Sequence, residues 1–255
     1  MKHPFHLVSP SPWPFVGAIG ALVSAIGLVL LMHHQGAYVL LMGLALVLFT
    51  MGGWWYDVIQ ESNQKGTYTP AVQTGLRLGM ALFIGSEVMF FVAFFAAFFD
   101  VSLFPVGGIW PPKGIRPLDP FDYPYFNTLL LLLSGTTITW AHHALLQNQK
   151  ESLLRGIGLT ILLGLFFTSL QVYEYAHASF GFKEGIYSST FYMATGFHGV
   201  HVMIGTLFLV LCWFRAHLGQ FTPTSHVGFE AAAWYWHFVD VVWLFLFISI
   251  YWWGS

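Results

Sequence analysis

A glutamate lies in the middle of a long apolar stretch of this sequence, where its carboxyl group could hold or carry a proton. The stretch runs from Leu78 to Phe99, and Glu87 is its only side chain able to carry a charge. A helix of this length is about 33 Å long, enough to cross the apolar core of a bilayer. Glu87 would then lie near the midplane, where a charge costs about 2.5–3.5 kcal/mol. It is therefore either a step in a proton relay or a neutral acid held by a hydrogen bond.

The sequence around Glu87 favours the neutral acid. Arg77 is too far along the same helix to pair with it, at about 15 Å. The residues three and four positions away are all apolar: Phe83, Ile84, Phe90 and Phe91. We therefore expect no relay partner on this helix, a protonated Glu87 that faces lipid or a helix contact, and nothing that would compensate a charge at this position.

Histidines are the second kind of residue that could do chemistry, as ligands of a metal or a haem. His198 and His201 are three residues apart in "GFHGVHV", which places them on one helix face at a spacing compatible with metal binding. A metal site brings further ligands and acids that orient them, and the sequence lacks the several histidine clusters of a membrane di-iron enzyme. We therefore expect no metal and no catalytic residue in this chain.

The amino-acid composition indicates whether water or lipid surrounds the chain. Hydrophobic residues make up 56% of the 255 residues and charged residues 8%, against about 25% charged in soluble domains. So little charge cannot cover a surface in water, so the chain must lie largely in lipid. The nine Lys and Arg are scattered and the net charge is −2, which argues against nucleic-acid binding. The single cysteine, Cys212, excludes an internal disulfide and a two-cysteine copper centre.

Seven segments are long and apolar enough to cross a membrane. Each is a single run, and spans of this length must be helices because lipid offers the backbone no hydrogen bonds. The sequence thus predicts an all-α membrane protein with these spans: Phe15–Met32, Ala37–Tyr56, Leu78–Phe99, Phe126–Leu146, Gly156–Tyr173, Thr190–Phe214 and Phe229–Trp253.

The connections predict two groups of helices. Only "HHQG" joins the first two spans, which indicates an antiparallel hairpin, and a polar segment separates it from the other five. We expect a hairpin in residues 1–56, a connecting segment in 57–71 and a five-helix bundle in 72–255. Small residues at Gly17, Gly20, Ser24 and Gly27 in the first span, and at Gly79, Ser86 and Ala93 in the third, indicate close helix packing.

The basic residues predict the orientation. Lys and Arg near membrane spans favour the inner side, and six lie on the side of the N-terminus: Lys2, Lys65, Arg77, Lys150, Arg155 and Arg215. Three lie on the other side: Lys113, Arg116 and Lys183. We expect the N-terminus inside, and we expect the Trp and Tyr clusters at span ends to lie mostly at the level of the lipid head groups.

A stand-alone transporter is an alternative for a protein with intramembrane acids. Glu87, Glu230 and Asp240 are such acids, and they often mark ion pathways. Transporters, however, usually show repeat symmetry or paired broken helices, and neither is visible in this sequence. The sequence therefore argues against secondary transport.

Seven motifs closely resemble subunit III of cytochrome c oxidase, in order and over essentially the whole chain. They are "SPSPWP" (Ser9–Pro14), "WWYDVIQE" (Trp54–Glu61), "TPAVQTGLRLGMALFIGSEVMFF" (Thr69–Phe91), "GGIWPPKGI" (Gly107–Ile115), "TWAHHALL" (Thr139–Leu146), "FYMATGFHGVHVMIGTLFL" (Phe191–Leu209) and "FEAAAWYWHFVDVVWLFLFISIYWWGS" (Phe229–Ser255). The resemblance implies a two-helix hairpin and a five-helix bundle around a V-shaped cleft filled with phospholipid. The retained hairpin favours the cytochrome c branch over subunit III of a quinol oxidase, which is the alternative.

The resemblance also implies the function and the partners. A subunit III carries no redox centre, since the haems and coppers belong to chains I and II of the proton-pumping oxidase, and cytochrome c docks on the complex. The chain would bind chain I, hold phospholipids and support proton uptake and durability in turnover, in a bacterial or mitochondrial inner membrane with the N-terminus on the cytoplasmic or matrix side. Residues that match lipid-contacting positions of the family are Trp54, Trp55, Glu61, Arg77, Phe83 and Arg215.

Overall fold

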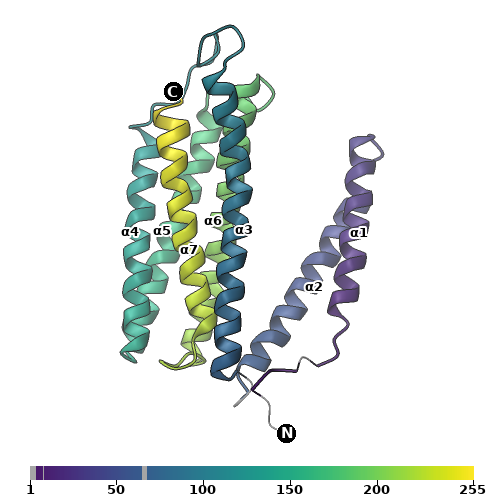
Figure 1. The fold of residues 1–255 in the computed structure, drawn as a ribbon, viewed down its shortest axis with the longest axis vertical. Coiled ribbons are helices and arrows are strands. Elements are labelled where there is room, and N and C mark those ends of the chain that lie inside the picture. Colours follow the sequence, from purple (N-terminus) through teal and green to yellow (C-terminus); the bar gives the residue numbers. More distant parts are fainter. Residues whose placement is uncertain (1–3, 8, 65–67) are drawn as a thin grey trace. The chain divides into compact units, whose positions relative to one another are not determined.

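The computed structural model describes residues 4–7, 9–64 and 68–255, which form seven α-helices and no β-strand (Figure 1). All seven helices are long and apolar enough to span a membrane, which confirms the predicted all-α membrane fold. A π-helical segment, η1, continues α7. The elements are α1 (Trp13–Met32), α2 (Tyr38–Ser62), α3 (Pro70–Leu103), α4 (Tyr123–Leu146), α5 (Lys150–His177), α6 (Ile186–His217), α7 (Val227–Leu246) and η1 (Phe247–Trp252).

Most helices extend beyond the predicted spans. The helix α3 begins at Pro70 and ends at Leu103, and α2 continues to Ser62. Hydropathy marks only the part of a helix that lipid surrounds, whereas the backbone stays helical until a turn residue ends it. Two residues that were counted for the orientation lie outside the described residues, namely Lys2 and Lys65. Residues 65–67 of the predicted connecting segment also lie outside them.

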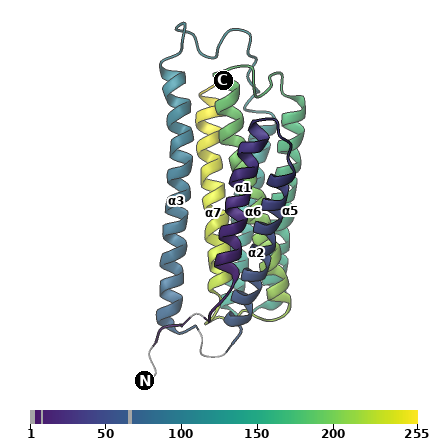
Figure 2. The ribbon, with the colours of Figure 1, turned by 90° about the vertical axis from the view of Figure 1, so that its right-hand side faces the viewer.

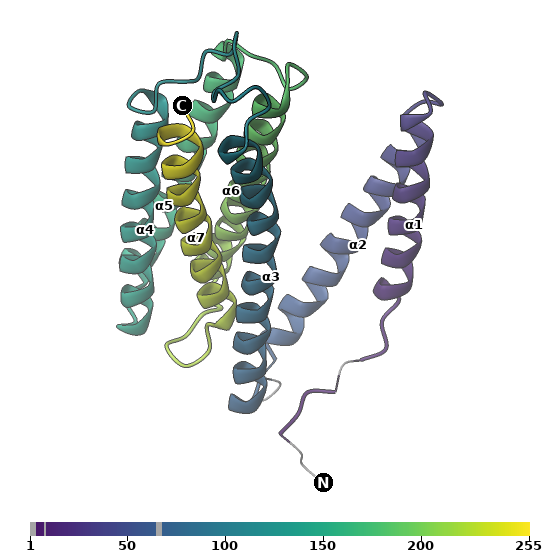
Figure 3. The ribbon, with the colours of Figure 1, turned by 45° about the horizontal axis from the view of Figure 1, so that its top comes forward.

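The chain divides into two compact units, residues 1–75 and 76–255. In the first unit, α1 and α2 run antiparallel and meet at a short turn (Figure 3). His34 and Gly36 have positive φ values of 59° and 93°, which lets the chain reverse at once. The predicted boundaries at residues 56 and 71 stay a prediction.

Glycines allow the backbones of the hairpin to touch, as predicted for the first span. A Cβ at Gly27 would lie 2.2 Å from the backbone nitrogen of Leu40, and one at Gly43 would lie 2.4 Å from that of Ser24. A rotation of side chains cannot relieve such contacts, because the nearest neighbour at both glycines is a backbone atom. Trp13 closes the other end of the hairpin, where its indole N–H donates to Asp57 at 2.6 Å.

In the second unit, α7 supplies the largest core side chains. Trp236 and Trp243 are fully buried, and their indole N–H groups donate to Ser134 and Thr128 at 2.8 and 2.9 Å. Trp236, from one of the aromatic clusters expected at the head-group level, thus packs inside this unit, and its depth in a membrane stays a prediction. Within this unit, α3 begins at the end opposite the C-terminus (Figure 1).

The helix α3 forms one edge of the five-helix unit (Figure 2). It meets α6 and α7 through long side chains: the ring of Phe90 lies 5.1 Å from that of Phe197, and Phe83 stacks on Tyr235. Its small residues do not make the predicted close contact inside this unit, since nothing lies within 4 Å of a Cβ at Gly79. Within the unit, α3 is therefore joined to α6 and α7 by long side chains and not by close approach of backbones at Gly79.

Candidate functional site

Glu87 on α3 has a partner on α6. Its Oε2 lies 2.8 Å from Nε2 of His201, and the side chains of Glu87 and His201 are 23% and 10% exposed. The expectation that nothing would compensate a charge at this position is wrong. The partner was missed because it follows 114 residues later in the chain, on another helix.

The second nitrogen of His201 fixes how many protons the pair carries. Nδ1 lies 2.6 Å from the carbonyl oxygen of Phe197, and a carbonyl oxygen only accepts, so Nδ1 carries a hydrogen. If the imidazole is neutral, Nε2 accepts a hydrogen from a protonated Glu87; if it is charged, Nε2 donates to a carboxylate. In both arrangements the net charge of the pair is zero, which avoids most of the cost of an isolated charge in lipid.

Aromatic rings enclose this pair. The ring of His201 lies 4.9 Å from that of Phe91, 6.3 Å from that of Tyr235 and 6.2 Å from that of Phe238. An apolar enclosure favours a neutral pair over separated charges. The predicted neutral Glu87 is thus compatible with the geometry, and its protonation stays a prediction.

His198 takes a different partner from His201, although the two share a helix face. Its Nε2 lies 3.1 Å from the carbonyl oxygen of Val239, and its ring packs against Trp243 and Phe167. Among the residues that the structure describes, no three His, Cys, Asp or Glu side chains are grouped so that they could hold a metal ion.

Arg77 and Glu230 form an ion pair between α3 and α7. The Nε of Arg77 donates to Oε2 of Glu230 at 2.8 Å, and the glutamate side chain is 15% exposed. A guanidinium group has five N–H donors, so this bond leaves most of them for a further acceptor such as a phosphate. Glu230, counted in the sequence among the intramembrane acids, is therefore half of an ion pair.

The end of α6 positions Arg215. Gly219 takes a φ of 71°, and the N–H of Gln220 bonds back to the carbonyl oxygen of Arg215 at 3.0 Å, a glycine-capped helix end. The side chain of Gln220 then accepts from Nε of Arg215 at 3.0 Å, and the guanidinium lies 4.6 Å from the ring centre of Phe221. These contacts hold the guanidinium group at the C-terminal end of α6.

The remaining predicted lipid residues are exposed or partly exposed. Trp54, Trp55 and Phe83 are 43%, 53% and 47% exposed, and Glu61 lies 3.2 Å from Nε2 of His6. Exposed aromatic side chains and charged groups near helix ends suit a contact with lipid. The structure brings Trp54, Trp55 and Glu61 together on α2 and puts Phe83, Arg77 and Arg215 in the five-helix unit; their lipid-binding role stays a prediction.

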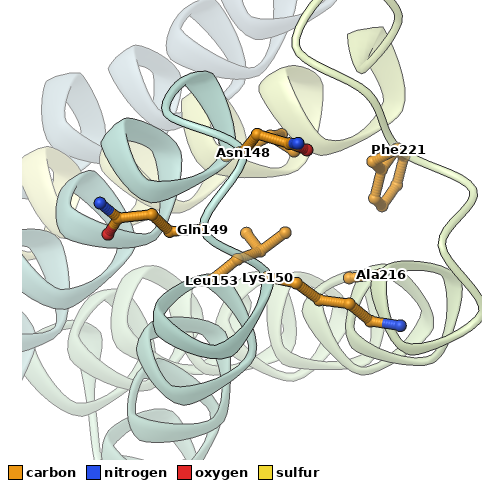
Figure 4. A pocket seen from close by; sticks show the side chains of 7 residues that line it. Asn148, Gln149, Lys150, Leu153, Ala216 and Phe221 are labelled. Atoms are coloured by element: carbon orange, nitrogen blue, oxygen red, sulfur yellow. The ribbon is translucent and has the colours of Figure 1, made fainter.

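A small pocket lies beside the ends of α4 and α6 (Figure 4). Its volume of about 70 Å³ has room for a few water molecules and not for a phospholipid head group. Lys150 lines it and donates from Nζ to the carbonyl oxygen of His217 at 2.7 Å, which satisfies a carbonyl at the end of α6. This pocket is therefore no candidate for the predicted lipid site.

These features define a multi-pass helical membrane protein. The described residues form seven helices long and apolar enough to span a membrane, acids on these helices pair with basic groups, and much apolar surface is exposed. The model of the family described as cytochrome c oxidase subunit III matches residues 3–255, so the chain belongs to this family. It is thus a subunit of a membrane-embedded oxidase complex.

Curated relatives agree over their full length. Cytochrome c oxidase subunit 3 of Marchantia polymorpha is 58% identical over 259 residues, which cover 100% of this chain and 98% of the relative. The protein of the same name from Triticum aestivum is also 58% identical with the same coverage. That of Formosania lacustris is 56% identical over 256 residues, 99% of this chain and 98% of the relative.

Proposed function

We propose that this chain is a non-redox subunit of the proton-pumping oxidase that passes electrons from cytochrome c to oxygen. It binds chain I, holds structural phospholipids, and supports proton uptake and durability during turnover. The observation that carries this proposal is the match over the whole chain to proteins named cytochrome c oxidase subunit 3. These names favour the cytochrome c enzyme over the quinol oxidase alternative and over a stand-alone transporter.

An inner membrane is the location that this proposal implies. The relatives from Marchantia polymorpha and Formosania lacustris support the mitochondrial inner membrane, and the bacterial cytoplasmic membrane is the alternative. The count of basic residues supports an N-terminus on the matrix or cytoplasmic side.

Purification tests the proposed place in the complex. The chain extracted in mild detergent is expected to co-purify with a chain that carries haem and copper and with a chain that carries a two-copper centre. Separated from them, it should be colourless and free of stoichiometric iron and copper in elemental analysis. A metal that stays with the isolated chain, or a haem-free native complex, would contradict the proposal.

Removing the guanidinium of Arg215 tests lipid retention. In the assembled oxidase, Arg215→Ala is expected to lower the phospholipid retained per complex and to shorten the active lifetime several-fold, with the initial rate little changed. The reason is that arginine binds a phosphate through paired hydrogen bonds that alanine cannot make. Mass spectrometry of bound lipid and activity followed over many turnovers are the measurements.

Arg155→Ala provides the matched control for this experiment. Arg155 lies on α5 and pairs with Glu151 on an exposed helix surface, so its loss removes one positive charge without touching the end of α6. Equal lipid loss in both variants would point to general charge attraction and would reject a specific site at Arg215.

A further inference from the structure

Four buried polar side chains in the five-helix unit are not used by the function proposed above. Gln171 and Glu174 lie on α5, Asn127 on α4 and Tyr251 on η1, and each is at most 4% exposed. The predicted fifth span ended at Tyr173, so the sequence interpretation did not count Glu174 as a membrane-embedded acid. The structure continues α5 to His177 and places this acid in the core.

Gln171, Glu174 and Tyr251 bond to one another, but one oxygen of Gln171 and one of Glu174 stay outside this network. The hydroxyl of Tyr251 donates to Oε1 of Glu174 at 2.7 Å, and the amide nitrogen of Gln171 donates to the same oxygen at 3.1 Å. The second amide hydrogen points to the hydroxyl of Tyr251, at 3.4 Å. Both bonds of Gln171 use its amide nitrogen, not its oxygen. Neither Oε1 of Gln171 nor Oε2 of Glu174 has a partner among the described residues.

Asn127 lies at the same level of the bundle as Gln171. The helices α4 and α5 are neighbours that run in opposite directions (Figure 1), and the ring of Tyr123 lies 5.2 Å from that of Tyr173. Asn127 follows Tyr123 by about one turn, and Gln171 precedes Tyr173 by half a turn, so both lie within about one turn of each other. Both atoms of the Asn127 amide, Nδ2 and Oδ1, have no partner among the described residues and are buried.

We propose that Asn127, Gln171 and Glu174 bind an ordered water molecule inside the five-helix unit. A water molecule donates two hydrogen bonds and accepts two, so it can donate to Oε1 of Gln171 and to Oε2 of Glu174 while it accepts from the Asn127 amide. If Glu174 is protonated on Oε2, its O–H needs an acceptor, which the same water provides. A single water molecule therefore meets the hydrogen-bonding needs of these groups in either protonation state of Glu174.

The apolar surroundings favour a bound water molecule over polar atoms without partners. Buried polar atoms without partners are strongly unfavourable in a membrane-embedded core, and native proteins satisfy them with other side chains or with ordered water. A site of this kind also fixes the spacing of α4 and α5, because Asn127 comes from α4 and the other two ligands come from α5. It is a site separate from the pair Glu87–His201, which lies on α3 and α6.

The effect of Asn127→Leu on thermal stability tests the proposal, because a site with water and a dry site predict opposite directions. In the assembled oxidase, Asn127→Leu is expected to lower the temperature at which this chain is lost from the complex by about 5 °C, because the water loses a ligand and leaves two acceptors unpaired. If the site is dry, the same substitution removes an unpartnered amide and the temperature stays or rises. Asn63→Leu, at an exposed position after α2, should leave it unchanged.

Two further measurements test the site, and the second of them holds even if Asn127→Leu fails to assemble. Gln171→Leu alone and combined with Asn127→Leu should destabilise less than additively, because both ligands share one water. In the unaltered oxidase, a structure that resolves solvent should show a water within about 3.2 Å of Glu174 Oε2 and Gln171 Oε1. Additive effects, or a direct contact between the two amides with no water between them, would overturn the proposal.

Discussion

Glu87→Lys is expected to prevent stable assembly of this chain into the oxidase, whereas Glu87→Gln should assemble and support proton pumping nearly normally. Lysine replaces a pair of zero net charge by one with a positive charge next to His201, in a site enclosed by Phe91, Tyr235 and Phe238. The cost of an uncompensated charge at this depth is about 2.5–3.5 kcal/mol, roughly a 70- to 370-fold loss in the assembled fraction. Glutamine keeps an N–H donor toward Nε2 of His201. The yield of complete complex and the proton stoichiometry are the measurements.

A charge exchange supplies the control for Glu87→Lys. The double variant Glu87→Lys/His201→Glu restores a neutral pair between α3 and α6, so it should recover part of the lost assembly. Ser86→Lys, at the same depth on the exposed side of α3, measures the general cost of a lysine there. No recovery in the exchanged pair would show that depth, rather than the contact with His201, explains the loss.

The relay alternative has its own decisive outcome. If Glu87→Gln assembled fully and yet abolished proton pumping, Glu87 would be a relay residue and the neutral pair would be wrong. A hydrophobic carbodiimide reacts with protonated carboxyl groups, so it should modify Glu87 from the lipid side. Its side chain is 23% exposed, enough for a small reagent to reach it.

The second large effect is expected in the hairpin, where Gly27→Ala/Gly43→Ala should separate α1 from α2. The added methyl groups would lie 2.2 and 2.4 Å from backbone nitrogen atoms of the facing helix, and overpacking costs about 1–3 kcal/mol a site. Alanine also gains about 0.5–1 kcal/mol in a helix relative to glycine, which the clash outweighs. Limited proteolysis at the turn between α1 and α2, with the yield of complex, measures the separation.

Gly52→Ala is the matched control in the same helix. Nothing lies within 4 Å of a Cβ at Gly52, so only the gain in helix propensity remains and the variant should be as stable as the unaltered chain or slightly more stable. If the double variant and the control behave alike, the close approach at Gly27 and Gly43 does not hold the hairpin together.

The amino-acid sequence by itself determined the seven spans, the hairpin and the family. Length and hydropathy suffice for spans because lipid forces each crossing segment to satisfy its own backbone. The packing of the first span could also be predicted, since Gly20 and Gly27 recur at helical spacing and do lie against α2. The same reasoning failed for Gly79 on α3, where small residues face out of the unit, because spacing identifies a helix face and not what covers it.

Only the tertiary structure decided which polar groups meet. Glu87 and His201 are 114 residues apart, and Arg77 and Glu230 are 153 apart, so no local pattern links them. The same holds for the neighbours of Trp236, which is buried among the helices of its unit, and for Glu174, which lies one residue beyond the predicted span. The physical reason is that a helix has its faces fixed by sequence, while the neighbour of each face is fixed by how all the helices pack around one another.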